Sequence, residues 1–318
     1  MIRLSLGTAA RLGLIAMQAE TLPTTAYLLH GESCRMNCAF CPQAREAGGK
    51  AGRLGRVSWP PFSREEVIAG LQQAAAKGLQ RICLQALCEP GAGSALAGLI
   101  RRLTGAADLP VSLSAPVHSV AGAALFFKAG ADRISIALDT VSEELSARYK
   151  GGGFKKRLRL LRECARLWPG RMSTHIICGL GETEEEAAQL LDLLVREDIA
   201  VGLFAFTPLK GTPLGGQPPP EPGSYRRLQA LYYLLRHGHI SWKDLRFNEG
   251  RLVSFGISGR ELRRLLGGGE AFQTGGCPGC NRPYFNERPG GLIYNYPRPL
   301  SAAETAAALA FIREENVP

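Results

Sequence analysis

The sequence predicts an α/β fold, specifically a full or nearly full (β/α)8 barrel of the TIM type. Short apolar runs alternate with helix-like stretches along most of the chain. Repeated strand–helix units build parallel sheets covered by helices. Eight such units in about 250 residues indicate a closed barrel. An open doubly wound sheet is the alternative fold.

The elements follow one another at an even spacing. Each strand candidate is a short run rich in aliphatic residues, and Ser63 and Glu66 have capping-box spacing at the first covering helix. The expected strands are residues 26–30, 81–86, 111–114, 133–138, 174–178, 201–206, 240–247 and 271–274. The expected helices are residues 63–77, 94–103, 120–128, a stretch ending at 167, 183–196, 225–235, 261–266 and a final helix over 301–315.

These elements suggest three parts of the chain. We expect residues 1–25 to form an N-terminal helical extension and residues 26–276 to form the barrel. Residues 277–318 would be a C-terminal motif with a tail, because residues 281–289 have neither a strand nor a helix period.

The composition restricts the possible partners. The chain has 318 residues with 38 Lys and Arg against 28 Asp and Glu, a formal charge of +10. No basic run is interleaved with aromatic residues, so we expect no nucleic-acid partner. The apolar N-terminal run is broken by Arg11 and is too short to span a bilayer, so we expect no membrane contact and a cytoplasmic location. An acidic protein is the partner that best fits the charge.

Three of the nine cysteines lie within eight residues. Cys34, Cys38 and Cys41 have the spacing C-x3-C-x2-C in the loop after the first strand, where a barrel places its catalytic face. Such close spacing indicates metal ligation. Three thiolates can hold three corners of a [4Fe–4S] cluster and leave one iron open. A zinc knot or three buried thiols are the alternatives.

This spacing, with Phe40 before the third cysteine, resembles the signature of the radical S-adenosylmethionine (SAM) superfamily. The resemblance implies that the open iron binds SAM and that a 5′-deoxyadenosyl radical forms. Leu87-Cys88-Glu89-Pro90 resembles the Gly-Gly-Glu-Pro element of these enzymes, with both glycines replaced. It implies that Glu89 accepts the SAM amino group.

Two further segments extend the resemblance. Residues 175–182 are similar to the strand-five element that lies against the adenine, which implies that Gly179 and Glu182 contribute to the cofactor site, although His175 replaces its first glycine. Asp139 follows the fourth strand and is a candidate for binding ribose hydroxyls or substrate.

Within the superfamily, residues 20–275 resemble biotin synthase and its relatives. The resemblance implies that Cys83 ligates an auxiliary iron–sulfur cluster and that Arg246 belongs to the strand-seven arginine segment. Biotin synthase also has cluster cysteines on strands three and five. Neither strand has one at the matching place here, and Ser173 stands on the fifth. Biotin synthase itself is therefore not expected.

A second cysteine pair, Cys277-Pro278-Gly279-Cys280, follows the eighth expected strand. It is a half-site for a second cluster, and half of a zinc ribbon or a redox pair are the alternatives. Residues 277–283 and 286–289 resemble the C-terminal signature of the archaeal-type lipoyl synthases that work as two related proteins. The resemblance implies a second, auxiliary [4Fe–4S] cluster that donates sulfur to an octanoyl chain on a lipoyl carrier domain. It also implies a paralogous partner and an electron donor such as ferredoxin or flavodoxin.

The expected function is therefore a radical SAM sulfurtransferase of the lipoyl synthase type. Other biotin-synthase-like enzymes (biotin synthase, a mutase or a cofactor-maturation enzyme) are the first alternative. A non-catalytic iron–sulfur or zinc protein is the second. We expect Cys164 and Cys178 to be core residues, whereas Cys88 is either a packing residue or a neighbour of the first cluster.

Overall fold

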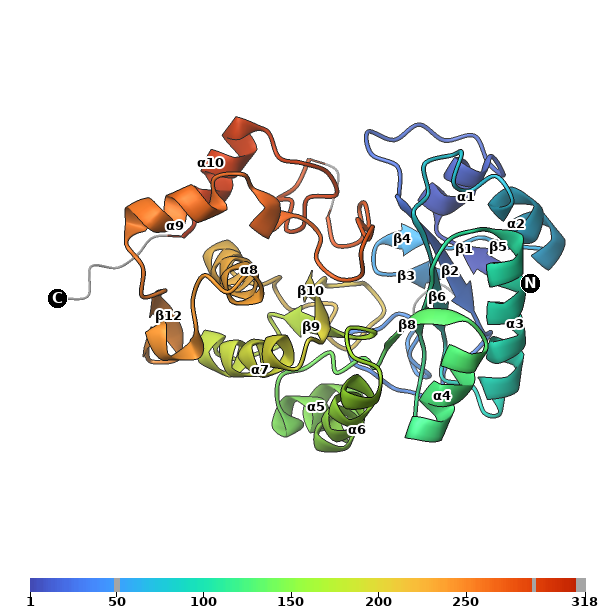
Figure 1. Cartoon of the computed structure of the whole chain (residues 1–318), viewed down its shortest axis with the longest axis horizontal. Helices are drawn as coiled ribbons and strands as arrows, with labels where there is room; N and C mark the ends of the chain where they lie inside the picture. Colours follow the sequence, from blue (N-terminus) through green and yellow to red (C-terminus); the bar gives the residue numbers. More distant parts are fainter. Residues whose placement is uncertain (49–51, 288–289, 313–318) are drawn as a thin grey trace.

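A curved eight-stranded sheet forms the centre of the computed structural model, which describes residues 1–48, 52–287 and 290–312 (Figure 1). The strand order is β10-β9-β8-β7-β6-β2-β1-β5. Six neighbouring strands run parallel, whereas β1 (Ile2–Leu4) and β5 (Pro61–Phe62) join one edge antiparallel. The parallel strands are β2 (Thr25–His30), β6 (Arg81–Ala86), β7 (Val111–Ser114), β8 (Ala131–Ser135), β9 (Met172–Cys178) and β10 (Ala200–Ala205).

Helices cover the outer face of this sheet (Figure 1). They include α2 (Arg64–Leu71), α3 (Ala92–Ala106), α4 (Val120–Lys128), α6 (Phe154–Leu167), α7 (Glu184–Arg196) and α8 (Pro222–Arg236). Ser63 and Glu66 form the predicted capping box at the start of α2. The helical stretch expected up to residue 167 is two helices, because three consecutive glycines with positive φ, Gly151–Gly153, separate α5 (Glu143–Lys150) from α6.

The N-terminal segment does more than form the expected helix. It contains the helix α1 (Leu6–Leu12) and also the edge strand β1, which has only three residues and therefore shows no recognisable pattern in the sequence.

A short hairpin of β3 (Arg53–Leu54) and β4 (Val57–Ser58) follows the cysteine loop. Near the other end, α9 (Gly259–Leu266) and α10 (Ala302–Ala310) lie in the orange and red part of Figure 1. Residues 313–315 of the expected final helix lie outside the described residues.

The predicted α/β barrel of the TIM type is confirmed as a partial barrel, whereas the prediction is wrong at strands seven and eight, which do not join the sheet. Residues 246–254 form a separate antiparallel hairpin of β11 (Arg246–Asn248) and β12 (Arg251–Ser254). Part of the expected seventh strand is the 3-10 helix η1 (Trp242–Asp244). The expected eighth strand begins in the 3-10 helix η2 (Glu270–Phe272). Within the described residues, no strand pairs with the free edge of β10.

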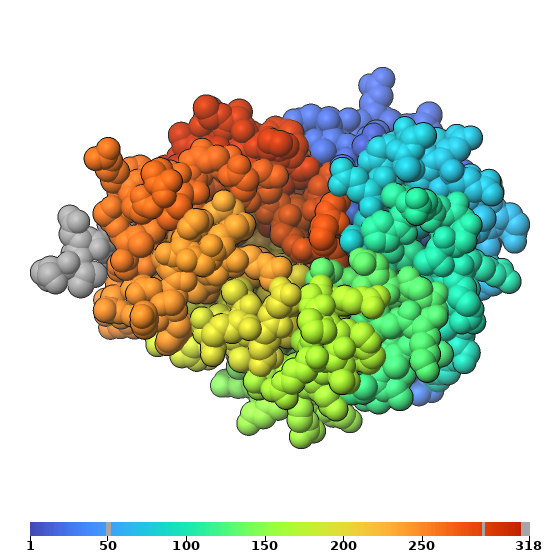
Figure 2. Space-filling model, viewed as in Figure 1, coloured from blue at the N-terminus to red at the C-terminus, as the bar shows by residue number. Residues whose placement is uncertain are grey.

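Residues 275–287, which we call the closing segment, take the place of the missing strands. Thr24 Oγ1 and Thr25 Oγ1, at the start of β2, donate to the Gly279 carbonyl at 2.8 and 2.7 Å. At the other side, Asn286 Nδ2 donates to the Ala205 carbonyl of β10 at 2.8 Å. The segment therefore connects the two sides of the open sheet through side chains instead of a strand ladder. In Figure 2, orange and red atoms accordingly meet blue and cyan atoms near the middle of the molecule.

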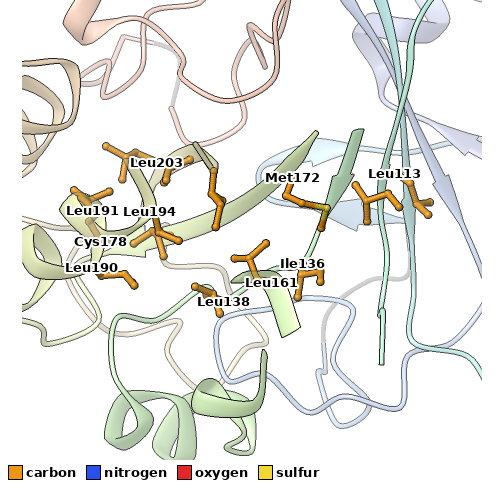
Figure 3. Packing of buried hydrophobic residues seen from close by; sticks show 14 of the residues in the cluster. Leu113, Ile136, Leu138, Leu161, Met172, Cys178, Leu190, Leu191, Leu194 and Leu203 are labelled. Atoms are coloured by element: carbon orange, nitrogen blue, oxygen red, sulfur yellow. The ribbon is translucent and has the colours of Figure 1, made fainter. Parts of the chain in front are cut away.

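The apolar core lies between the sheet and the helices. Cys178 is 1% exposed and lies beside Leu190, Leu191 and Leu194 of α7 (Figure 3). Cys164 on α6 is completely buried in the same core. Both are therefore packing residues, as expected from the sequence. In the described part of the chain, no helix is both long and apolar enough to cross a membrane.

Candidate active site

A cavity of about 700 Å³ lies inside the curved sheet. Because side chains alternate between the two faces of a strand, alternate residues of β2, β6, β7, β9 and β10 point into it. The cavity extends from the first residues of the strands, such as Thr25 and Arg81, to the loops after their carboxyl ends, such as residues 34–43. The inward side chains include Tyr27, Cys83, Ser112, Ser173, His175 and Phe204.

The first cysteine group lies at the carboxyl end of the strands, as predicted. Cys34, Cys38 and Cys41 all line the cavity from the loop after β2. The Cys41 N–H donates to the Cys38 carbonyl at 3.0 Å, so this part of the loop is a tight turn. Burial raises the pKa of Cys38 to about 12 and that of Cys41 to about 11. Both thiols are thus protonated until a metal displaces the proton.

The arrangement of these thiols fits a cluster. All nine cysteines are free of disulfides. Within the described ranges, no three His, Cys, Asp or Glu side chains converge on a point that could hold a single metal ion. A [4Fe–4S] cluster does not need such convergence, because each thiolate binds a different iron. Three thiols of one loop facing one cavity satisfy that requirement.

Glu89 supports the same loop from the neighbouring strand. Its Oε1 accepts the backbone N–H groups of Glu32 at 2.6 Å and Ser33 at 3.0 Å, directly before Cys34. These hydrogen bonds lower the pKa of the carboxyl group, with the Ser33 N–H as the largest cause. Within the described residues, no protein hydrogen bond reaches Oε2. Glu89 is therefore an ionised carboxylate with one oxygen left for a ligand, although it stands just outside the cavity lining, next to Leu87 and Cys88.

Asp139 also lines the cavity, in an unusual conformation. Its φ of 65° is in the left-handed region, and its backbone N–H and carbonyl bond to His175 and Ile177 of β9 at 2.8 and 2.9 Å. The carboxylate forms an ion pair with the buried Lys150 at 2.7 Å. The structure thus places Asp139 where the sequence predicted, but its carboxylate is already paired with the Lys150 ammonium group.

The second cysteine group lies deeper in the same cavity. Cys277-Pro278-Gly279-Cys280 is a turn closed by the Cys280 N–H, which donates to the Cys277 carbonyl at 3.0 Å. Proline second and glycine third, with φ of 77°, are typical of a type II turn. Cys83 lies in β6, level with Tyr27 of β2. The thiols of Cys83, Cys277 and Cys280 all line the cavity. The sequence predicted that this turn would meet Cys83 at the carboxyl ends of the strands, and this prediction is wrong. Because the sheet does not close, the turn meets Cys83 near the amino ends of the strands instead.

Two arginines lie beside this second group, the buried Arg81 and the half-buried Arg282. Arg81 donates from Nε to the Pro278 carbonyl at 2.8 Å and from Nη1 to Asp132 at 2.6 Å. The Arg282 guanidinium lies 3.8 Å from the centre of the Phe204 ring and donates to the Gly275 carbonyl at 2.9 Å. Desolvation raises the pKa of Cys83 and of Cys280, and both arginines oppose this rise. Such cations favour an anionic thiolate cluster at this place.

Sequence reasoning missed Arg81, Arg282 and Tyr27. Arg282 directly follows the second cysteine pair in Cys280-Asn281-Arg282-Pro283, which was a usable signal. His175 was noted only as a departure from a glycine. Its ring packs edge-on against Phe204 inside the cavity, and burial lowers its pKa to about 4, so it is neutral at pH 7.

Besides Glu89, whose free carboxylate oxygen keeps it a candidate, three predicted cofactor residues lie outside the cavity lining. Arg246 is exposed on β11, since its hairpin does not join the sheet, and its side chain donates to the Lys243 and Leu245 carbonyls. Glu182 accepts the N–H groups of Gly179 at 2.5 Å and Leu180 at 2.9 Å, so it closes its own turn. A Cβ at Gly179 would lie 2.8 Å from Pro220. We therefore leave all three out of the proposed ligand set.

The fold and the cysteine loop can now be compared with known proteins. The family description "Radical SAM superfamily" matches residues 28–194, which is more than half of the chain and includes the cysteine loop. This chain belongs to the radical SAM superfamily. Membership implies a [4Fe–4S] cluster and SAM, in agreement with the predicted family.

Among curated proteins, this radical SAM chain is similar to biotin synthases. It is 27% identical to the enzyme of Synechococcus sp. (strain JA-3-3Ab) over 228 residues, 69% of either chain. It is 24% identical to that of Acaryochloris marina over 188 residues, 57% of this chain and 52% of the relative. Among solved structures, methylornithine synthase superposes with a TM-score of 0.56 at 18% identity, covering 67% of this chain and 63% of that one. The matches thus span about half to two thirds of these relatives.

Proposed function

We propose that this radical SAM enzyme inserts sulfur into an octanoyl chain carried by a lipoyl carrier domain, as a lipoyl synthase component. The observation that carries the proposal is that two groups of three thiols line the same cavity. When bound, the first cluster supplies the electron that cleaves SAM, and the auxiliary [4Fe–4S] cluster supplies the sulfur. Cys34, Cys38 and Cys41 would hold the first cluster, and Cys83, Cys277 and Cys280 the second.

The walls of the cavity suit an acyl chain. They are largely apolar, with Leu54, Val57, Trp59 and Phe204 among the lining residues. Apolar walls exclude water, which protects a carbon radical from side reactions. They also bring a flexible chain within contact of both cysteine groups, and such positioning decides which hydrogen is removed.

An anaerobic assay tests the proposal directly. The reconstituted protein is mixed with SAM, dithionite and an octanoylated carrier domain, and the product is analysed by mass spectrometry. The proposal requires 5′-deoxyadenosine together with an octanoyl group that has gained sulfur. SAM cleavage without any sulfur in the product would favour a mutase or cofactor-maturation enzyme. The absence of SAM cleavage would favour a non-catalytic iron–sulfur or zinc protein.

We predict that Glu89→Gln weakens SAM binding about ten- to hundredfold, which corresponds to roughly 1.5–3 kcal/mol for a charge-assisted hydrogen bond. The amide oxygen still accepts the Glu32 and Ser33 N–H groups, so the loop keeps its support. The free Oε2 becomes an NH2 group, which has no negative charge and cannot accept a hydrogen bond from the SAM ammonium group. Equilibrium binding of SAM to the reconstituted protein measures the effect, and the iron content serves as the control. Unchanged SAM affinity would show that Glu89 does not bind the cofactor.

We further propose that the basic side of α6 docks an acidic carrier domain. Lys155, Lys156 and Arg159 are exposed on this helix, and Lys156 also lines the cavity. Positive charge beside the entrance would speed the encounter with an acidic partner. A paralogous lipoyl synthase and a one-electron donor such as ferredoxin or flavodoxin complete the proposed set of partners.

We predict that Lys156→Glu lowers kcat/KM for the octanoylated carrier domain roughly two- to fivefold, as expected for an exposed charge at an interface. A short octanoyl-lysine peptide lacks the acidic surface, so its turnover should not change. Lys243→Glu is the matched control, because Lys243 is exposed on η1 and does not line the cavity. Equal losses with the carrier domain and the peptide would contradict docking at α6.

A further inference from the structure

The hydroxyl group of Tyr27 lies against the second cysteine group. Tyr27 is 6% exposed on β2, and its oxygen is 3.4 Å from Cys280 Sγ. The same oxygen accepts the backbone N–H groups of Arg282 at 2.8 Å and Asn281 at 3.2 Å. A tyrosine hydroxyl has one hydrogen to donate and can accept two. Because the two N–H groups occupy its acceptor sites, its hydrogen is directed to the sulfur.

The closing segment holds this geometry in place. The Asn281 side chain accepts the Thr24 N–H at 3.0 Å and donates to the Leu22 and Pro297 carbonyls, each at 3.2 Å. Together with the two threonine bonds to Gly279, these contacts fix the turn of Cys280 against β2. The Tyr27 contact is thus part of a well-anchored network inside the protein.

We propose that Tyr27 is a positioning residue that donates a hydrogen bond to the Cys280 thiolate and thereby raises the reduction potential of the auxiliary cluster. The inference rests on the proposed function, since it requires Cys280 to be a cluster ligand. A hydrogen bond to a ligating sulfur stabilises negative charge there, and a reduced cluster carries one more negative charge than an oxidised one. Among the described residues, Cys280 has the one cysteine sulfur within hydrogen-bond distance of the Tyr27 hydroxyl, so Cys34, Cys38 and Cys41 receive no such hydrogen bond.

The test measures the reduction potential in the full-length protein by EPR-monitored titration. Tyr27→Phe should lower the potential of the auxiliary cluster, leave that of the first cluster unchanged and retain all iron. Tyr232→Phe is the matched control, since the Tyr232 hydroxyl accepts the Val201 N–H at 2.9 Å and has no hydrogen bond to a cysteine in the described part of the chain. A potential that is unchanged in Tyr27→Phe, with the iron retained, would overturn the inference.

Tyr27→Phe also removes the acceptor of two N–H groups, so a second variant keeps the test decisive. A fluorinated tyrosine at position 27 still accepts both N–H groups but is a stronger donor, and it should shift the auxiliary potential upward. An unchanged or lowered potential with this side chain would refute the hydrogen bond. If the Cys34, Cys38 and Cys41→Ala variant retains no iron at all, the auxiliary cluster and the proposed function fail. If it retains iron, but the reduction potential of the remaining cluster does not change when Tyr27 is replaced, only this inference fails.

Discussion

Replacing Cys34, Cys38 and Cys41 together by alanine should abolish SAM cleavage and remove about half of the iron. The wild-type protein should hold about eight irons in two [4Fe–4S] clusters, and the triple variant about four. The effect should be complete because, in the proposed site, three thiolates of one loop would be the whole protein ligand set of the first cluster, so their loss would leave no iron to bind SAM. Iron and sulfide analysis after anaerobic reconstitution, with 5′-deoxyadenosine measured by chromatography, checks both parts.

Cys88→Ala is the control within the same cavity. Cys88 lines the cavity beside this loop, and its carbonyl accepts the Arg35 N–H at 3.0 Å through the backbone alone. This variant should therefore keep about eight irons and cleave SAM. A triple variant that retained its full iron content and its SAM cleavage would refute the first cluster site. Loss of activity in Cys88→Ala would assign that residue a role beyond packing.

Replacing Cys277 and Cys280 together by alanine should abolish sulfur transfer while SAM cleavage continues. The two cysteines are the first and last residues of one turn near the amino ends of the strands, whereas the first cysteine group lies at the carboxyl ends. The loss of the proposed sulfur donor should thus leave the first cluster intact. We expect 5′-deoxyadenosine without any thiolated octanoyl product, measured in the carrier-domain assay.

Cys164→Ala serves as the control for this pair, because Cys164 is completely buried on α6 outside the cavity. It should retain both activities, with at most a loss of stability. If the double variant still thiolated the octanoyl chain, the turn would not be the sulfur donor. Loss of both activities together with all iron would indicate that the turn has a structural role in closing the sheet.

Much of the first site could be predicted from the sequence because it is local. The three cysteines of the first group lie within eight residues, and the strand before them shows an apolar run. The predicted bounds of residues 81–86, 111–114 and 120–128 agree with β6, β7 and α4. In each case, short-range spacing and hydrogen bonding within a few residues determine the outcome.

The sequence by itself therefore determined the α/β class, the cysteine loop and its family. Only the tertiary structure decided that six parallel strands form the barrel and that residues 275–287 close it. It also decided that Arg246 lies outside the cavity and that Tyr27 meets Cys280, 253 residues further along the chain. The physical reason is that sheet closure is a competition between a strand ladder and side-chain hydrogen bonds from distant segments. No local pattern records which of the two is more stable.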